Sequence, residues 1–581
     1  MGIPGLARRL APYSSRCSEQ DLKGYSAIVD GPSLAYEAHR LAFSAAATQT
    51  RIPSYADINN EAVKWLSALE EQGINVATII FDGALPESKQ AERVPRTEQN
   101  NRRVQQLRAS YPATTCPTPT YLSSTSYAFL APSLREALGD SPFASRTRIV
   151  SGEADDFCAL YAKDHPKSII FTSDTDLLLF DYDPETLVAL FMDADSLAGL
   201  KTYSPYQVAE KLHVKSLVLF AYAIQQLPYG GTVDISEDAC KVDVDSRSYL
   251  NFSQRYIAAM VTPKYMQENS NLTPPLQALD VRVSEYVFEA LNASQNLAVS
   301  IAQSLPHLVM GVFEFVREAL SGSQSIPVYL PLLVEDPNLA SAWNMAQDVR
   351  TLAYSLLAPG ASKISEYRRK AQHITPEDIN PLPAIGVQMQ AKELEERISG
   401  LLKWSESKDI SPTLLWSLFA LSLVLVELNT PPTLTLVSRV LNGDFDNTWT
   451  YIQFTARLQA AMYSLRMLKQ VTTVWLPMNP QAESELHASL SQIDFYMSNF
   501  PSISDMFIVP GQAHRVVLEH EQLKRLIEEI FISAGVEVKQ VSNKKKKRQT
   551  REAERKMRKA EQRQQAKPSN LFALLDSGGP T

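Results

Sequence analysis

The sequence predicts an α/β fold with a mostly parallel central sheet, and three features of the first 190 residues support this prediction. Four short β-branched segments, YSAIVDG, VATIIFDG, RTRIVSG and KSIIFTSDTD, read as strands. Helical patterns such as EAVKWLSALEEQG lie between them. Each strand-like segment ends in small or acidic residues. This alternation is typical of parallel sheets flanked by helices.

The composition is that of an ordinary globular protein. The chain has 581 residues, 45% of them hydrophobic and 21% charged, which suggests two to four domains. No CxxC pair is present among its four widely spaced cysteines, so neither a disulfide framework nor a zinc site is indicated: Cys17, Cys116, Cys158 and Cys240.

The longest apolar run, residues 410–426, favours a buried helix over a membrane span. It contains Pro412 and is slightly short for a span. Ser411 is well placed to cap a helix that has Pro412 in its first turn. We therefore expect no membrane partner.

The pattern of apolar residues and the distribution of charge divide the chain into three parts. We expect an α/β domain at 1–240, a mostly α-helical region at 241–540 and a disordered basic tail at 541–581. Residues 544–567 hold twelve Lys and Arg against three Glu, a net charge of +9, and the rest of the chain carries −17.

The tail allows three interpretations. Its most basic run consists of Lys544, Lys545, Lys546, Lys547 and Arg548. A nuclear localisation signal is the simplest interpretation, non-specific attachment to RNA or DNA is the second, and a solubilising tail is the third. The first two are compatible. We expect the nucleus as the main location, with the cytoplasm as a second one.

Six acids follow the four predicted strands where each strand ends: Asp30, Asp82, Glu153, Asp155, Asp174 and Asp176. For any single acid after a strand, capping of the next helix is the simpler interpretation. Six acids at the carboxyl edge of one sheet would repel one another and resist ionisation, so they favour divalent cations as counter-charges. Hard cations such as Mg²⁺ prefer oxygen ligands and leave room for a phosphodiester.

A basic segment follows Asp82 and suits an approaching phosphate. Its cations are spaced so that several would share one side of a helix: Lys89, Arg93, Arg96, Arg102 and Arg103. Considered alone, these cations are more simply explained as a solvated basic helix face. Beside the six acids, they predict a nucleic-acid-binding surface.

Together these segments resemble the flap endonuclease and XPG superfamily of nucleases, which have a PIN-like domain. The resemblance is carried by MGIPGL, IVDGPSLAY, IIFDGALPESK, SGEADDFCALYA and FTSDTDLLLF, in the family's order across residues 1 to 185. The long helical remainder is most similar to the Asteroid branch. The resemblance implies an N-terminal motif at 1–96, a gateway-like insertion at 97–145 and an internal motif at 146–240.

The resemblance also implies roles for individual residues. The six acids would hold two Mg²⁺ or Mn²⁺ ions, and Lys89 and Arg96 would contact the scissile phosphate. Tyr36 would stack on a base near the cut, and Gly2 would lie close to the DNA. Asp155 stands where the family more often has the longer Glu. In the insertion, PATTCPTPTYLSSTS is rich in Pro, Ser and Thr and predicts a loop that is flexible at least in part.

One expected acid has no counterpart. The family has a further aspartate before a glycine-rich element that grips duplex DNA, whereas AIQQLPY in the matching region contains no acid. Asp234 comes too late in the sequence, and Gly230 and Gly231 are a weak phosphate-loop candidate.

Two functions therefore stay open. The first is a metal-dependent, structure-specific endonuclease acting on branched, flapped or single-stranded/duplex junction DNA, in DNA repair or processing. DNA is the expected nucleic-acid partner, with RNA as an alternative one. The second is a nuclease-fold protein with little or no activity that binds nucleic acid as a scaffold in RNA or translation regulation. A protein partner could bind through the helical region or the tail.

Overall fold

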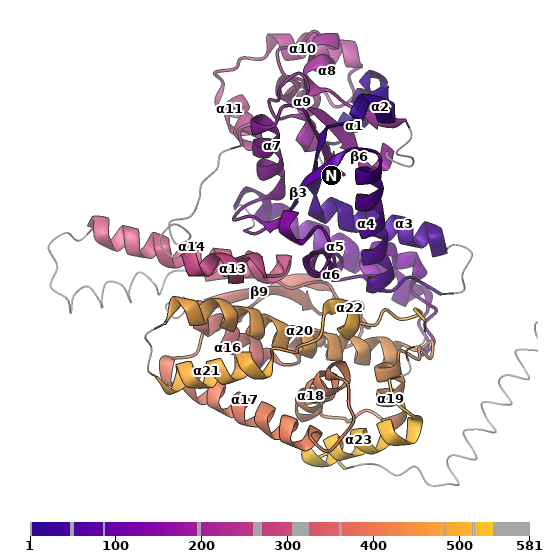
Figure 1. Cartoon of the computed structure of the whole chain (residues 1–581), viewed down its shortest axis with the longest axis vertical. Coiled ribbons are helices and arrows are strands. Elements are labelled where there is room, and N and C mark those ends of the chain that lie inside the picture. The colour runs from indigo at the N-terminus through magenta and orange to yellow at the C-terminus, as the bar shows by residue number, and fades with distance from the viewer. Residues whose placement is uncertain are drawn as a thin grey trace, which may run out of the picture.

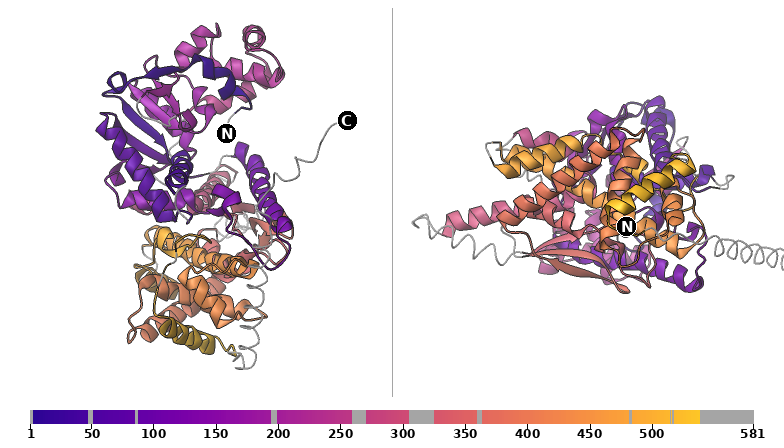
Figure 2. Two further views of the ribbon diagram at one scale, coloured as in Figure 1. Left: turned by 90° about the vertical axis from the view of Figure 1, so that its right-hand side faces the viewer. Right: turned by 90° about the horizontal axis from the view of Figure 1, so that it is seen from below.

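A computed structural model of the chain describes residues 3–46, 51–84, 87–193, 199–258, 270–304, 325–358, 363–480, 484–513, 515 and 517–537. Gly2 and the tail residues 544–548 lie outside these ranges, so the roles expected of them stay predictions. The described part has an α/β half and a mainly helical half, stacked along the long axis (Figures 1 and 2).

A five-stranded parallel sheet forms the α/β half, in the order β4 (Thr147–Ile149), β3 (Asn75–Phe81), β2 (Ser26–Asp30), β5 (Ser168–Thr172) and β6 (Leu187–Leu190). The four strands predicted from sequence are four adjacent members of this sheet. The predicted parallel α/β fold is therefore confirmed. A small antiparallel pair, β1 (Ser15–Cys17) with β7 (Leu200–Thr202), lies beside it.

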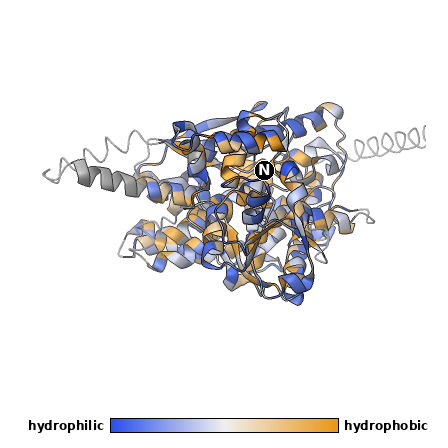
Figure 3. Cartoon of the chain, turned by 90° about the horizontal axis from the view of Figure 1, so that it is seen from above, coloured by the Kyte–Doolittle hydropathy of each residue, from blue (hydrophilic) through white to orange (hydrophobic). Residues whose placement is uncertain are grey.

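Side chains of the sheet alternate between two hydrophobic cores. In β2, Val29 faces the first core and Ile28 the second; in β5, Phe171 and Ile170 divide in the same way. A strand buried on both faces reads as a continuous apolar run, as these segments do. Figure 3 shows hydrophobic and hydrophilic residues alternating along the surrounding helices, as expected of helices with one buried side.

Helices cover both faces of the sheet. On the first face lie α2 (Glu19–Leu22), α3 (Gly31–Ala46), α4 (Tyr55–Glu71) and α6 (Leu130–Gly139). On the second face lie α1 (Leu6–Leu10), α7 (Ala154–Asp164), α8 (Pro205–Lys211), α9 (Leu217–Gln226), α10 (Thr232–Lys241) and α11 (Arg247–Ser253). The first core also continues into the second half of the chain, so the two halves share one hydrophobic interior.

The second half is mainly helical, as predicted. Its helices are α13 (Thr273–Gln277), α14 (Val281–Ser304), α16 (Gln347–Leu357), α17 (Ala384–Ser405), α18 (Pro412–Glu427), α19 (Leu434–Asn442), α20 (Trp449–Met478), α21 (Glu485–Tyr496), α22 (Ile503–Met506) and α23 (His520–Ser533). The sequence did not predict its three-stranded sheet, β8 (Ser325–Tyr329), β9 (Lys363–Lys370) and β10 (His373–Ile379). Polar and charged residues in β9 and β10 conceal the strand pattern.

The apolar run at 410–426 forms α18 as expected. Ser411 caps the helix by accepting a hydrogen bond from the backbone N–H of Leu414 (3.3 Å), and Pro412 is its first residue. Among the helices of the described ranges, none combines the length and apolarity needed to cross a membrane.

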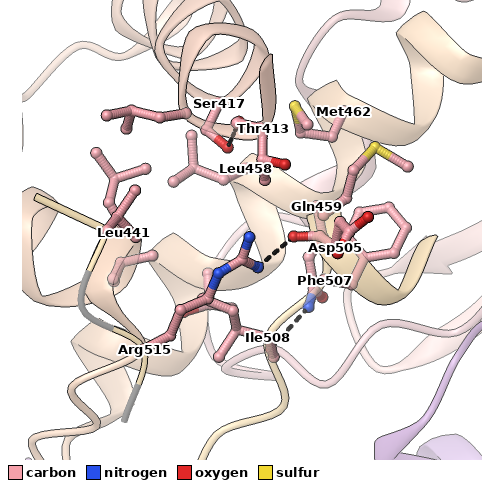
Figure 4. Close-up of a pocket in the computed structure, with 15 residues that line it drawn as sticks. Thr413, Ser417, Leu441, Leu458, Gln459, Met462, Asp505, Phe507, Ile508 and Arg515 are labelled. Atoms are coloured by element: carbon pink, nitrogen blue, oxygen red, sulfur yellow. Dashed lines mark hydrogen bonds between the residues drawn. The ribbon is translucent and has the colours of Figure 1, made fainter. Parts of the chain in front are cut away.

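A small cavity of about 50 Å³ lies beside the first turns of α18 (Figure 4). Leu441, Leu458 and Met462 supply its apolar wall. On the polar side, Arg515 donates to the backbone carbonyl of Asp505, and Gln459 donates to that of Ile508 (3.3 Å). Because these polar groups are already paired, the cavity is a packing feature of the helical half.

The gateway-like insertion differs from the expected flexible loop. It begins inside α5 (Glu87–Ser110), and its described residues pack against the helical half. The backbone N–H of Cys116 donates to Asn447 (2.7 Å), and Thr115 pairs with Thr448 in a β-bridge. Cys116 is buried in a small core with Leu122 and Trp449. The Pro- and Thr-rich composition is therefore that of an ordered connection with few regular hydrogen bonds of its own.

Arg350 is the most fully enclosed charge of the helical half. Its guanidinium and the Glu366 carboxylate are both 0% exposed and lie 2.6 Å apart. The guanidinium also donates to the carbonyl of Trp343 (2.6 Å) and to Ser464 (2.9 Å). Removing one partner of such a pair leaves the other charge buried without compensation.

We predict that Arg350→Leu lowers the free energy of unfolding by about 3–5 kcal/mol. The matched control is Lys363→Leu on β9, the strand that also carries Glu366, because the Lys363–Asp378 pair is 44% and 50% exposed and its loss should cost less than about 1 kcal/mol. Urea denaturation measures both. Equal effects of the two substitutions would contradict this account.

Candidate active site

The sheet places all six predicted acids along one edge. Asp30 is the last residue of β2, Asp82 follows β3, Glu153 and Asp155 follow β4, and Asp174 and Asp176 follow β5. These four strands are neighbours and run parallel, so their carboxyl ends meet. This edge is where ligands bind in open α/β sheets.

Asp30 is the most buried of the six, with 5% of its surface exposed. Its Oδ2 accepts hydrogen bonds from the hydroxyls of Ser33 and Thr172 (2.7 Å for Thr172). Burial raises the pKa of Asp30 to about 6, while these hydrogen bonds oppose the rise. The carboxylate is therefore held rigidly and would gain from a nearby cation.

Asp82 is fixed by two elements far apart in sequence. Its Oδ1 accepts the backbone N–H of Ala154 (2.8 Å) at the start of α7, and its backbone carbonyl accepts the Ser284 hydroxyl (3.3 Å) from α14. The next residue must be glycine, because a Cβ on Gly83 would lie 1.7 Å from the carbonyl oxygen of Val150. Burial raises the pKa of Asp82.

Lys89 lies among the acids that follow β4. Its Nζ is 2.6 Å from Glu153 and 3.6 Å from Asp155. Burial raises the pKa of Glu153 to about 7 and that of Asp155 well above its usual value, although Lys89 opposes both shifts. For Lys89, burial acts to lower the pKa, but the two carboxylates outweigh it and the pKa rises. Lys89 therefore serves as the counter-charge of this cluster.

The acids that follow β5 contact the N-terminal segment. Asp174 accepts the backbone N–H of Asp176 (3.0 Å), which starts a 3-10 turn (Thr175–Leu178). Asp176 in turn accepts the backbone N–H of Ile3 (3.1 Å) and lies 3.5 Å from the hydroxyl of Tyr256. Burial and the charge of Asp174 raise the pKa of Asp176 to about 6. The residue after Gly2 thus lies against the acids.

Two cavities open onto this edge and share Lys89, Glu153, Asp155 and Asp174 as lining. The larger, about 540 Å³, is also lined by Asp30, Asp82, Tyr36, Arg93 and Arg96. The smaller, about 320 Å³, is also lined by Asp156, Asp176, Arg96, Gln225 and Tyr256. Together they bring all six acids to the walls of one region.

The predicted nucleic-acid contacts divide into two groups. Tyr36 is 53% exposed and lines the larger cavity, so its ring is free to meet a base. Lys89, Arg93 and Arg96 lie in the first part of α5, at the cavity. Arg102 and Arg103 are exposed farther along α5 and do not line either cavity.

Sequence reasoning missed the contribution of α14. Glu285 lines the larger cavity and accepts from Arg93 (2.8 Å) and Arg282 (2.8 Å). Burial raises the pKa of Glu285 to about 7, against the effect of Arg282. The guanidinium of Arg93 is therefore already paired with Glu285 in this structure. Glu285 comes from α14, which begins about 100 residues after the segment FTSDTDLLLF. No local spacing in the sequence signals this acid.

The region of the missing seventh acid has a different character. Gln225, exposed at the end of α9, lines the smaller cavity where a further acid was sought. Asp234 caps α10 by accepting the backbone N–H of Gly231 (3.1 Å). The N–H of Gly231 therefore already donates to a carboxylate and is not free to bind a phosphate. Gly230 and Gly231 do not form a phosphate loop here.

The donor chemistry of the site fits a divalent cation. All six side chains offer oxygen, and five have raised pKa values, so a cation would relieve their buried charge. Within the described residues, however, no three His, Cys, Asp or Glu side chains are arranged to coordinate one ion. The carboxylates point instead to Lys89 and to hydroxyl and backbone donors.

Comparison with known proteins supports the resemblance. Residues 126–380 match the family model described as XPG domain containing. This part of the chain is therefore similar to XPG domains. The match includes Glu153, Asp155, Asp174 and Asp176, whereas Asp30 and Asp82 precede it. It also extends past residue 240 into the helical half, and the predicted boundary at 240 stays a prediction.

A curated relative supports the resemblance to the Asteroid branch. Asteroid homolog 1 of Schizosaccharomyces pombe (strain 972) is 28% identical over 256 residues, which are 42% of this chain and 44% of that protein. The chain thus aligns with less than half of that relative's length. The superfamily recognised from the sequence motifs, and the likeness to Asteroid proteins, are both confirmed.

Solved structures with similarity to the chain include two protein–DNA complexes. Human GEN1 in complex with Holliday junction DNA has a TM-score of 0.28 and 16% identity, covering 44% of this chain and 59% of that one. The catalytic core of Rad2 in complex with DNA substrate has a TM-score of 0.29 and 17% identity, covering 46% and 75%. The fold of the α/β half is described by the strand order of its own five-stranded sheet.

The raised pKa of Asp30 predicts a stability change with a definite sign. Both folded and unfolded states hold its proton below about pH 4, and above about pH 6 the folded state contains a buried charge. In EDTA, Asp30→Asn should therefore be more stable than wild type at pH 7.5, by up to about 3 kcal/mol, with the difference vanishing near pH 4.

Thermal and urea unfolding across this pH range measure the effect. The control is Asp21→Asn, because Asp21 is exposed and its pKa is lowered by Ser18, so its loss should not stabilise the protein at pH 7.5. A destabilised Asp30→Asn at pH 7.5 in EDTA would refute the assignment of a strained carboxylate.

Proposed function

We propose that the chain is a divalent-cation-dependent nuclease that hydrolyses phosphodiester bonds at flaps, branches or single-strand/duplex junctions in DNA. The observation that carries the proposal is the convergence of six acids and Lys89 on one solvent-open edge of an XPG-type sheet. Folding alone does not favour so many partly buried carboxylates at one edge, because each makes ionisation of its neighbours less favourable.

The residues of this edge would serve three purposes: binding cations, contacting the phosphate and stacking on a base. Asp30, Asp82, Glu153, Asp155, Asp174 and Asp176 would hold Mg²⁺ or Mn²⁺, with two ions expected. The bound cations would supply activation of water and neutralisation of charge at phosphorus. Lys89 and Arg96 would donate to the non-bridging phosphate oxygens, and Tyr36 would stack on an adjacent base and fix the strand.

The surroundings favour a substrate with a single-stranded part. The turn between α9 and α10, where a duplex grip was sought, presents the capping carboxylate of Asp234. Tyr36, in contrast, offers an exposed ring beside the acids. Stacking on a ring requires an unpaired base, whereas duplex phosphates would be repelled at α10. Action in DNA repair or processing is part of this proposal.

A second candidate function is a nucleic-acid-binding scaffold without cleavage, in RNA or translation regulation. Two contacts favour it: Lys89 occupies the space between Glu153 and Asp155, and Glu285 neutralises Arg93. An enzyme must release Lys89 from the acids when cations bind. A scaffold can keep this arrangement unchanged.

Cleavage of labelled 5′-flap, hairpin and splayed-duplex DNA in Mg²⁺ or Mn²⁺ separates the two functions. The wild type should cut at least one of them, and Asp174→Ala with Asp176→Ala should cut at least about 100-fold more slowly. The control is Asp243→Ala with Asp245→Ala, an exposed pair with the same spacing outside the site. Binding without cutting by the wild type, measured by gel shift, would favour the scaffold.

We also propose a nuclear location, which rests on the charge of residues 544–567. Deletion of this segment should reduce nuclear accumulation of a fluorescent fusion, and it should weaken salt-sensitive binding of nucleic acid. If neither quantity changes, the segment only solubilises the protein.

A further inference from the structure

A second large cavity lies at the opposite end of α5 from the acids. Its volume is about 750 Å³, and it is lined by residues 112–114, by the segment 428–439 and by the first turns of α20. Lys89 and Arg108 are 19 residues apart on α5, or about 28 Å at 1.5 Å per residue. The cavity is therefore separate from the candidate active site.

Arg457 is the unusual residue of this cavity. It projects from α20, and its Nε is buried without any hydrogen-bond partner. Burial lowers its pKa, although the charge of Glu335 acts in the opposite direction. Within the described ranges, no ion pair or hydrogen bond satisfies its guanidinium. A buried donor left unpaired is unfavourable, so an anion that accepted from the guanidinium of Arg457 would be bound favourably.

The acidic residues of the cavity wall are already neutralised. Asp336 is 2.9 Å from Arg108, and Asp446 is 3.3 Å from Arg439. Asp446 also accepts the hydroxyl of Thr448 (2.6 Å). These two carboxylates thus have cationic partners of their own, whereas Arg457 has none. The cavity retains one uncompensated positive charge.

Two helices begin at this cavity and add to its positive potential. The first turns of α19 and α20 contribute Thr435 and Thr450 to the wall. Helix N-termini carry partial positive charge, which favours anions. Thr433 and Thr448 cap these two helices, so their hydroxyls are already engaged. Four further hydroxyl groups line the same space: Thr114, Thr430, Thr435 and Thr450. A phosphate group can use the guanidinium and these hydroxyl groups as donors.

We propose that this cavity binds a phosphate-bearing ligand of nucleotide size, with its phosphate on Arg457. The volume lies within the range that small-molecule sites use, about 300–1,000 Å³, and exceeds what a bare phosphate needs. Pro431, Leu436 and Phe454 supply an apolar wall for the remainder of the ligand. A planar guanidinium suits a phosphate because it donates two parallel hydrogen bonds.

Calorimetric titration of the full chain in EDTA tests the proposal, with adenosine 5′-monophosphate, inorganic phosphate and adenosine as probes. The nucleotide should bind, phosphate should bind more weakly, and adenosine should not bind. Arg457→Gln should weaken nucleotide binding at least about tenfold. Arg525→Gln, on the exposed side of α23, is the matched control and should leave the affinity unchanged.

Thermal unfolding without ligand checks the fold of each variant. Because Arg457 has an unsatisfied donor, Arg457→Gln should unfold at or above the wild-type temperature; Arg457→Lys provides a second variant that keeps the charge. The proposal is overturned if the nucleotide does not bind at about 10 mM, if Arg457→Gln binds it as tightly as wild type, or if adenosine binds equally well. If inorganic phosphate binds as tightly as the nucleotide does, the proposal of a nucleotide-sized ligand is wrong.

Discussion

Buried negative charge at the carboxyl edge of the sheet is the constraint on which the rest of this structure depends. Burial raises the pKa values of Asp30 and Asp176 to about 6 and that of Glu153 to about 7. Hydroxyls and backbone N–H groups stabilise single carboxylates, and a nearby cation offsets the mutual repulsion of the ionised acids. Lys89 supplies that charge here, and it comes from α5 rather than from the sheet.

The helical half holds α5 and the acids in register. Glu98 of α5 accepts the backbone N–H of Ile374 on β10 (2.9 Å), so the helix that carries Lys89 is anchored to the second sheet. On the other side, Arg466 of α20 binds both Glu136 (2.8 Å) and Asp280 (2.9 Å). Asp280 starts α14, which brings Glu285 to the cavity. The helical half is thus part of the site's framework and not an appended module.

Features set by neighbouring residues in the chain could be predicted from the sequence, whereas features set by packing between distant segments could not. Asp30 and Asp82 could be placed because each directly follows an apolar strand, and parallel strands share an edge. The cap at Ser411 was predictable for the same local reason. Glu285 and the ordering of residues 111–126 were not, because both depend on packing between segments far apart in the chain. The strand β9 was hidden by the buried charges of Glu366 and Arg369, and β10 by the partly exposed acids Glu377 and Asp378.

Lys89 is the counter-charge of the acids at this edge, and it is also the side chain proposed to contact a phosphate. An ammonium 2.6 Å from Glu153 cannot at the same time donate its full charge to a phosphate. Entry of a divalent cation would satisfy Glu153 and Asp155 and lower the attraction that holds Lys89 between them. The freed side chain lies in the wall shared by both cavities, where an incoming phosphate is expected. Cation binding and phosphate binding would then be coupled, because each removes a competitor of the other.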